Sequence, residues 1–163
     1  MYNQKPLTLS DKDYTLFTGL IYRTSGINLD SHKKELLKTR FQKIIRQRGF
    51  TSYKEYYEYV CADQKGEALS EMIDAISTNH TYFFREKQHF DLLREKILPH
   101  IVKKKTVRRE KRIRAWCAAS STGEEPYAIM MCLLETFNTA GWDVKLLATD
   151  ISTKVLRKAI EGV

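Results

Sequence analysis

The stretch Arg114–Tyr127, RAWCAASSTGEEPY, passes from an apolar run to a small-residue loop and then to a helix start, and the fold prediction begins from it. The run Ile113–Ala118, broken only by Arg114, is typical of a buried parallel strand. The loop Ala119–Gly123 has so little side-chain bulk that a ligand could approach its backbone closely. Pro126 suits a first helical position, because its φ is fixed and it has no N–H. We therefore predict a strand, a tight loop and a helix whose N-terminus faces that loop.

A second strand is predicted further along the chain. Val144–Thr149 is mostly apolar and is followed directly by Asp150. In doubly wound sheets, an acid at the end of the second strand can accept hydrogen bonds from both hydroxyls of a ribose. Asp150 is therefore the candidate ribose ligand.

The loop itself indicates which kind of nucleoside would bind. It contains one glycine, Gly123, instead of a G-x-G-x-x-G pattern, and it is followed by two acids, Glu124 and Glu125. Two carboxylates disfavour a pyrophosphate and favour a cationic nucleoside, of which S-adenosylmethionine is the common one. The alternative explanation is structural, since acids in the first turn of a helix also complement its dipole.

Composition sets the broad class of the protein. The chain has 163 residues, 28 Lys plus Arg against 20 Asp plus Glu, and 42% hydrophobic residues, which is typical of a soluble globular protein of one or two domains. The polar start Met1–Lys5 does not resemble a signal peptide, and no apolar run is long enough to span a bilayer. The thiols lack C-x-x-C spacing, so we expect buried, reduced cysteines in the cytoplasm and no disulfide, and the histidines lack ligand spacing, so we expect no metal site.

The first ninety or so residues are predicted to be helical. The expected helices start after Ser10 and end at Gly26, run from about Ser31 to Arg48, start after Ser52, and start after Gly66. A further helix with Phe90, Leu93 and Leu98 is expected to bridge to the second part of the chain.

Positive charge is concentrated in two segments. The helix Ser31–Arg48 has a net charge of +6 and the segment Lys103–Arg114 one of +7, whereas the whole chain has only +8. The second segment is interpreted as a solvated linker. Local charge of this kind indicates a docking surface, although a non-catalytic adaptor or a nucleic-acid-binding module remains an alternative. Phe41 is the only aromatic residue among these cations, which disfavours base stacking.

Three separated motifs together carry a family resemblance. They are TNHTYFFRE at Thr78–Glu86, AASSTGEEPYAI at Ala118–Ile129 and ATDISTKVLRKAIEGV at Ala148–Val163, in this order along the chain. The chain resembles the CheR family of chemotaxis receptor methyltransferases over nearly its whole length. The resemblance implies an α plus α/β fold, in which a small all-helical N-terminal domain precedes the first part of a Rossmann-like, S-adenosylmethionine-dependent methyltransferase sheet. The expected division is a helical domain at 1–85, a bridging helix or linker at 86–106, and the incomplete α/β domain at 107–163.

The resemblance also implies an activity and a site. It implies methylation of glutamate side chains on the cytoplasmic helices of chemoreceptors, giving methyl esters and S-adenosylhomocysteine. The cofactor-binding residues that it implies are Asn79, Thr81, Arg85, Glu125 and Asp150. Arg85 is also the catalytic candidate, since a guanidinium can pair with the carboxylate of either the cofactor or the substrate glutamate. An exposed Glu is already ionised at neutral pH, so no general base is expected.

The same resemblance implies a binding partner and a longer parent enzyme. It implies that the basic helix docks the acidic receptor helix, with Lys38, Arg40, Lys43 and Arg46 as the contact residues. We expect no nucleic-acid partner and no direct membrane insertion. The family's sheet has more strands than the two predicted here, so the expectation is that residues 1–163 are a piece of a longer enzyme, that this piece is inactive, and that its uncovered strands lead to self-association.

Overall fold

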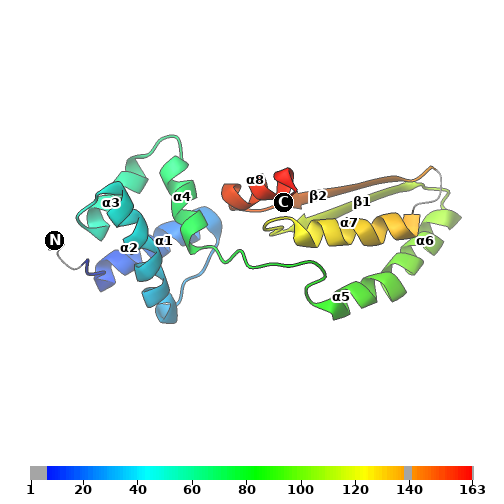
Figure 1. The fold of residues 1–163 in the computed structure, drawn as a ribbon, viewed down its shortest axis with the longest axis horizontal. Helices are drawn as coiled ribbons and strands as arrows, with labels where there is room; N and C mark the ends of the chain where they lie inside the picture. Colours follow the sequence, from blue (N-terminus) through cyan, green and yellow to red (C-terminus); the bar gives the residue numbers. More distant parts are fainter. Residues whose placement is uncertain (1–6, 138–140, 163) are drawn as a thin grey trace. The chain divides into compact units, whose positions relative to one another are not determined.

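A computed structural model describes residues 7–137 and 141–162 of the chain (Figure 1). These residues form two compact units, which meet in the sequence between Thr78 and Asn79. We call them the N-terminal unit and the C-terminal unit and describe each separately. No helix in the described ranges combines the length and the apolar character that crossing a membrane requires.

The N-terminal unit is all-helical, as the sequence predicts. Its elements are α1 (Asp11–Ser25), a 3-10 turn (Ser31–Lys33), α2 (Lys34–Arg48), α3 (Tyr53–Ala62) and α4 (Glu67–Ile76). The predicted start and stop residues are confirmed. Ser10 and Asp13 form a reciprocal capping box at the start of α1, and the Ser52 hydroxyl accepts a hydrogen bond from the Glu55 N–H at the start of α3.

Aromatic rings form the centre of the N-terminal core. The Phe17 and Phe41 rings meet edge to face with centroids 4.9 Å apart, and Tyr56 packs against both at 5.9 and 5.6 Å. All three side chains are fully buried. Because these rings come from α1, α2 and α3, their burial fixes the arrangement of those helices and leaves one face of α2 in solvent.

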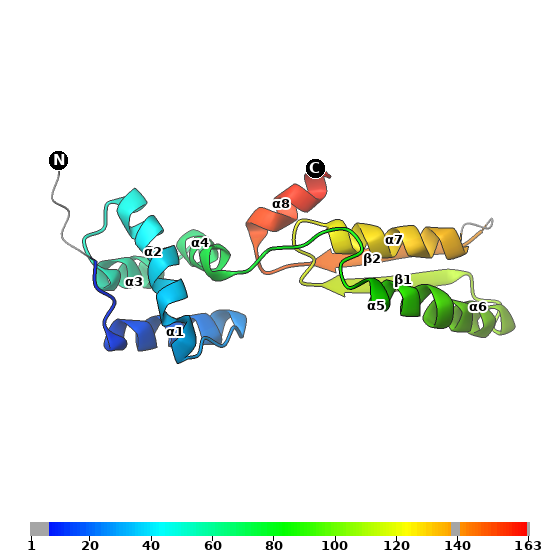
Figure 2. The same ribbon diagram turned by 60° about the horizontal axis from the view of Figure 1, so that its bottom comes forward.

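The C-terminal unit is built on two parallel strands. Its elements are α5 (Lys87–Leu92), a π-helical segment (Leu93–Ile97), α6 (Leu98–Val107), β1 (Arg112–Ala118), α7 (Glu124–Phe137), β2 (Asp143–Thr149) and α8 (Thr153–Glu161). Figures 1 and 2 show α5, α6 and α7 running along the strands. This strand–helix–strand unit with parallel pairing confirms the predicted α/β start.

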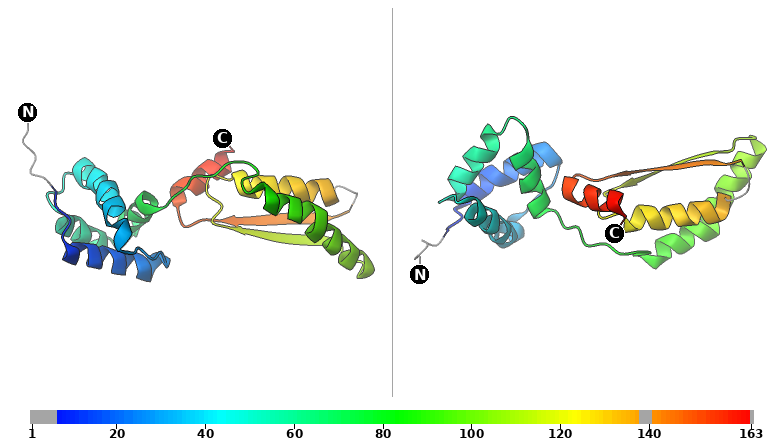
Figure 3. Two further views of the ribbon diagram at one scale, coloured as in Figure 1. Left: turned by 90° about the horizontal axis from the view of Figure 1, so that it is seen from below. Right: turned by 45° about the horizontal axis from the view of Figure 1, so that its top comes forward.

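Only one face of the two-stranded sheet is covered. Ile113 and Cys117 are buried, and a shared apolar cluster joins Ile113 to α5, α6 and α7. Trp116 and Leu147 occupy paired positions on the other face and are 71% and 62% exposed. The expectation of a strand buried on both faces was therefore wrong for the described residues, because all the helices of that cluster pack on the same side (Figure 3).

Three smaller expectations also need correction. Helix α7 begins at Glu124, two residues before Pro126, which a first turn tolerates because its N–H groups have no intrahelical partner. The segment Lys103–Arg114 is not an irregular linker, since it contains the end of α6, a turn and the start of β1. Cys61 is exposed, whereas Cys117 and Cys132 are buried, and all three are free thiols.

Candidate functional site

The loop after β1 has an unusual backbone. Ala119, Ser121 and Gly123 have φ values of 55°, 49° and 105°, in the left-handed region that residues other than glycine rarely adopt. At Gly123 a side chain would also be crowded, because a Cβ would lie 3.1 Å from the Cβ of Ala159 on α8. The loop is therefore held in a conformation that its sequence does not prefer, and such strain persists only where the surrounding contacts impose it.

Asp150 is one of the residues that hold the loop in this conformation. Because β1 and β2 are parallel with Ala118 opposite Thr149, Asp150 follows β2 at the edge of the sheet where the loop begins. Its Oδ2 accepts a hydrogen bond from the Ser121 N–H at 2.8 Å, and its Oδ1 accepts one from the Ser152 N–H at 2.8 Å. Each carboxylate oxygen can accept more than one hydrogen bond, and the half-buried Asp150 still has acceptor capacity for two hydroxyls.

The two acids at the start of α7 have different surroundings. Glu124 accepts a hydrogen bond from the Thr122 hydroxyl at 2.5 Å, so its carboxylate is engaged within the start of α7. Glu125 is exposed and lines an open groove of about 420 Å³ together with Arg85 and His89. Of the two acids, Glu125 is therefore the more exposed, and its role in binding a ligand stays a prediction.

The surroundings of Cys117 show that the negative charges of Glu125 and Asp150 both act near the end of β1. Burial of this thiol near the end of β1, together with the nearby negative charges of Glu125 and Asp150, raises its pKa to about 11. The site therefore has a negative local field at the carboxyl ends of the strands. A cationic group would be attracted there and a pyrophosphate repelled.

The segment Asn79–Arg85 lies against this site without forming a helix or strand. The Asn79 carbonyl accepts a hydrogen bond from the Ser121 hydroxyl at 2.9 Å, and Arg85 donates to the His80 carbonyl at 2.8 Å. Thr81 lines a separate, smaller groove of about 240 Å³ beside Thr122. The structure thus connects Asn79 with Asp150 through Ser121, and Arg85 with Glu125 through one groove, but it does not bring Thr81 into that groove.

Phe84 anchors the end of this segment. Its ring meets Phe90 with centroids 5.1 Å apart, and the guanidinium of Arg94 lies 5.3 Å from its centroid. Tyr82 and Phe83, the other two aromatics of the motif, are 53% and 49% exposed. One aromatic residue therefore fixes the segment while two remain accessible.

Sequence reasoning missed three residues of the site: Ser121, Cys117 and His89. Ser121 was only counted as small, yet its N–H and its hydroxyl both form hydrogen bonds with predicted site residues. No sequence signal distinguishes it from Ser120, whose buried hydroxyl has no partner among the described residues. His89 lines the groove through its position on α5, which only the packing of that helix determines.

The four cations predicted to bind a partner lie on α2. Lys38 pairs with Glu35 at 3.1 Å, and Arg40 donates to the Ala75 carbonyl at 3.3 Å. Lys43 and Arg46 are exposed and, within the described part of the chain, form neither an ion pair nor a side-chain hydrogen bond. Lys43 and Arg46 are therefore the members of this set with unengaged charge.

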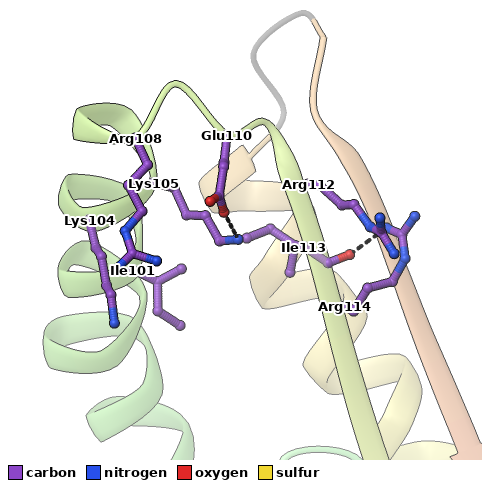
Figure 4. A pocket seen from close by; sticks show the side chains of 8 residues that line it. All are labelled: Ile101, Lys104, Lys105, Arg108, Glu110, Arg112, Ile113 and Arg114. Atoms are coloured by element: carbon purple, nitrogen blue, oxygen red, sulfur yellow. Dashed lines mark hydrogen bonds and ion pairs between the residues drawn. The ribbon is translucent and has the colours of Figure 1, made fainter.

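A second group of cations surrounds a groove at the opposite end of β1 (Figure 4). The groove measures about 680 Å³, and Lys105 and Arg114 in its wall pair with Glu110 and Asp143. Lys104 and Lys105 lie in the last turn of α6, where positive charge complements the helix dipole. The remaining lining residues are Ile101, Arg108, Arg112 and Ile113. These cations lie at the other end of the strand from Asp150 and take no part in the candidate site.

Possible metal ligands do not cluster among the described residues. Across residues 7–137 and 141–162, no group of three His, Cys, Asp or Glu side chains could hold a metal ion. The groups that the candidate site offers are the carboxylates of Glu125 and Asp150, the Arg85 guanidinium, the His89 imidazole, the buried Cys117 thiol, and backbone N–H groups and hydroxyls.

Comparison with known proteins gives matches over both units. Residues 12–77 match the family model described as the CheR methyltransferase all-alpha domain, and residues 79–163 match its SAM binding domain. A chemotaxis protein methyltransferase of Borreliella burgdorferi is 44% identical over 159 residues, which cover 96% of this chain and 56% of that protein. The chemotaxis protein methyltransferase of Escherichia coli is 38% identical over 157 residues, covering 96% of this chain and 52% of that protein. The chain thus spans about half the length of these relatives.

Proposed function

The chain belongs to the CheR methyltransferase family, and from that premise we propose that it is part of an enzyme that methylates glutamate side chains of a chemoreceptor. The methyl donor in this proposal is S-adenosylmethionine, in keeping with the SAM binding domain that residues 79–163 match. Because the chain spans about half of its relatives, the activity is proposed for a form extended to their length, which we call the full-length form. The 163-residue chain is proposed to be inactive by itself.

One observation supports this proposal above the others: Glu125 and Asp150 both act on the end of β1. Asp150 has acceptor capacity for the two ribose hydroxyls, and Glu125 offers negative charge to the cationic part of the cofactor. Two carboxylates would be poor neighbours for a pyrophosphate, so the same geometry argues against a dinucleotide. The donor set therefore fits S-adenosylmethionine.

The proposed reaction needs alignment more than acid–base chemistry. When bound, the cofactor supplies a methyl group on a positively charged sulfur. A glutamate carboxylate oxygen attacks the carbon of this methyl group, so that a C–O bond forms as the C–S bond breaks and S-adenosylhomocysteine leaves. No proton moves, since an exposed Glu with a pKa of about 4.3 is already ionised. The enzyme's contribution is to hold the reacting groups in line and to exclude water.

We assign roles to the residues of the Asn79–Arg85 segment within this proposal. Arg85 shares the groove with Glu125, and its guanidinium can pair bidentately with the carboxylate of the cofactor or of the substrate. Asn79 and Thr81 are assigned to the methionine end of the cofactor. Among the assigned residues, Thr81 has the weakest geometric support, because it lines a different groove.

The partner surface is proposed to be the exposed face of α2. A chemoreceptor helix that presents glutamates is acidic, and Lys43 and Arg46 offer unengaged positive charge to it, with Lys38 and Arg40 beside them. The N-terminal unit would then be the docking module, and the substrate would be met in the cytoplasm.

A methyl-transfer assay tests the proposal. The full-length form is incubated with S-adenosylmethionine carrying a radioactive methyl group and with the cytoplasmic domain of a chemoreceptor from the same organism. The expected product is labelled receptor whose label is released as methanol by mild base, as a carboxyl ester requires. Label that survives base would contradict the proposed methyl ester. No transfer, together with salt-sensitive binding of RNA, would contradict the proposal and favour a basic binding module.

A further inference from the structure

Ser121 occupies a central position that the proposed function does not use. Its side chain is 8% exposed, its φ is 49°, and it makes two polar contacts with other elements of the site. The N–H donates to Asp150 Oδ2 at 2.8 Å, and the hydroxyl donates to the Asn79 carbonyl at 2.9 Å. One residue thus joins the loop after β1, the acid after β2 and the irregular segment that begins at Asn79.

The Asn79–Arg85 segment has few other attachments. The hydrogen bonds of Arg85 run within the segment, to the carbonyls of His80 and Tyr82. Phe84 anchors its far end through the ring of Phe90. The Ser121 hydroxyl ties the start of the segment, at the Asn79 carbonyl, to the loop that joins β1 to α7.

The left-handed backbone at Ser121 makes this contact possible. A serine held at φ 49° adopts a conformation that is costly for a residue with a side chain, and such conformations persist where several contacts impose them. The bond from its N–H to Asp150 is one of those contacts. The position of the Ser121 hydroxyl, and through it that of Asn79, is therefore linked to the carboxylate of Asp150.

We propose that Ser121 is a positioning residue, which holds the Asn79–Arg85 segment against the carboxylate of Asp150 so that the two halves of the site stay in register. The statement that this site holds a cofactor rests on the proposed function, whereas the mechanical link rests on the hydrogen bonds alone. Loss of the hydroxyl should free the start of the segment and leave the sheet intact.

The neighbouring serine provides a matched control. Ser120 is 1% exposed, and its hydroxyl has no hydrogen-bond partner among the described residues. Ser120→Ala therefore removes the same group from the same loop without breaking a bond. Alanine is also compatible with the backbone required at residue 121, because Ala119 in the same loop has φ 55°.

The first test measures backbone order in the full-length form without cofactor. NMR order parameters of the Asn79 and Thr81 amides should fall from about 0.85, the value of a rigid backbone, to below about 0.6 in Ser121→Ala. Ser120→Ala should leave them unchanged, and the amides of β1 should keep their values in both variants. Unchanged order in Ser121→Ala, or an equal loss in Ser120→Ala, would overturn the proposal.

The second test separates this inference from the function. In calorimetric titration, Ser121→Ala should weaken S-adenosylmethionine binding by about fivefold, the usual effect of one neutral hydrogen bond, and Ser120→Ala by less than about twofold. Equal affinities in the two variants would show that the link does not serve the site. A full-length form that binds no cofactor at all would contradict the proposed function, while the order parameters, measured without cofactor, would still decide the mechanical link.

Discussion

Single residues decide the chemistry of the C-terminal unit, and they do so through burial and charge. Cys117 is 4% exposed, and its pKa rises to about 11 through burial and the nearby negative charges of Glu125 and Asp150. The reactive thiolate is therefore scarce at Cys117 near neutral pH. Cys61, in contrast, is exposed.

Alkylation should distinguish the two thiols. At pH 8, iodoacetamide should modify Cys61 rapidly and Cys117 only after unfolding, because burial blocks access to Cys117 and its raised pKa keeps it protonated. Mass spectrometry of the native and the urea-unfolded chain gives the measurement. Rapid native modification of Cys117 would show that the end of β1 is open.

The raised pKa of the Cys117 thiol also predicts that the C-terminal unit loses stability at alkaline pH. A thiol whose pKa is raised on folding stabilises the fold below its unfolded pKa, and this stabilisation is lost as the pH rises towards the folded value. The free energy of unfolding of the C-terminal unit should therefore fall between about pH 9 and about pH 11. Cys117→Ala removes this group, so its unfolding free energy should fall less over that range. Parallel curves for the two proteins would contradict the assignment.

Two substitutions of Arg85 test whether the reaction needs its planar guanidinium or only its positive charge. In the full-length form, Arg85→Ala should reduce methyl transfer by about 1.5–3 kcal/mol of transition-state stabilisation, the range for hydrogen bonds to charged groups. Arg85→Lys should restore only part of this, because an ammonium cannot form the planar bidentate pair. A rise in KM confined to the cofactor or to the receptor would identify which carboxylate Arg85 binds. Full activity in Arg85→Ala would remove its role.

The four predicted partner-binding cations on helix α2 differ in their angular position around the helix axis. With about 100° per residue, Lys43 and Arg46 lie near the middle of the exposed arc, while Lys38 and Arg40 lie at its two borders. The border residues are the ones already engaged, with Glu35 and with the Ala75 carbonyl. The middle of the arc should therefore contribute most to docking.

Charge reversal at the middle of α2 tests this. The double variant Lys43→Glu and Arg46→Glu should slow association with the receptor about tenfold or more at low salt and affect dissociation less, because charges at the rim of an interface act mainly through the on-rate. Stopped-flow or surface-based kinetics can measure this. Reversal of Lys12 and Lys65 makes the same change in net charge elsewhere on the N-terminal unit and should leave the rate nearly unchanged. An equal effect of both pairs would indicate net charge instead of a docking face.

Elements that depend on local signals could be predicted from the sequence, and those that depend on packing could not. The caps Ser10 and Ser52 act within a few residues, so the helices they start were predicted correctly. The end of β2 placed Asp150 correctly, because parallel strands end at the same edge. Trp116 was expected to be buried because it lies in an apolar run, but which face of a strand is covered depends on where helices far along the sequence pack. Ser121 was missed for a similar reason, since its left-handed backbone is imposed by a residue after the next strand.

For the whole molecule, the uncovered face of the sheet predicts how the 163-residue chain behaves. Trp116 and Leu147 lie exposed at paired positions, and in the described residues each strand has one edge without a partner strand. Exposed apolar surface and free edges recruit other strands. We predict that the chain either self-associates through this face or leaves β1 and β2 in rapid hydrogen exchange while the N-terminal unit stays protected.

Light scattering combined with hydrogen exchange can test this behaviour. Replacing Trp116 and Leu147 with lysine should weaken any self-association, because it places charge on the apolar face. Tyr22 is 62% exposed on α1 and Tyr22→Lys is the control, which should leave association unchanged. A monomer with well-protected amides at residues 144–149 would contradict the prediction.

The proposed function has Asp150 bind S-adenosylmethionine at the carboxyl ends of β1 and β2, and calorimetric titration of the full-length form can test this binding. Asp150→Ala should weaken binding by about 1.5–3 kcal/mol, roughly tenfold to a hundredfold, because it removes a charged acceptor of hydrogen bonds. Asp143→Ala makes the same substitution at the other end of β2, where Asp143 pairs with Arg114, and should leave the affinity unchanged. Unchanged affinity in Asp150→Ala, or an equal loss in both variants, would show that Asp150 does not bind the cofactor.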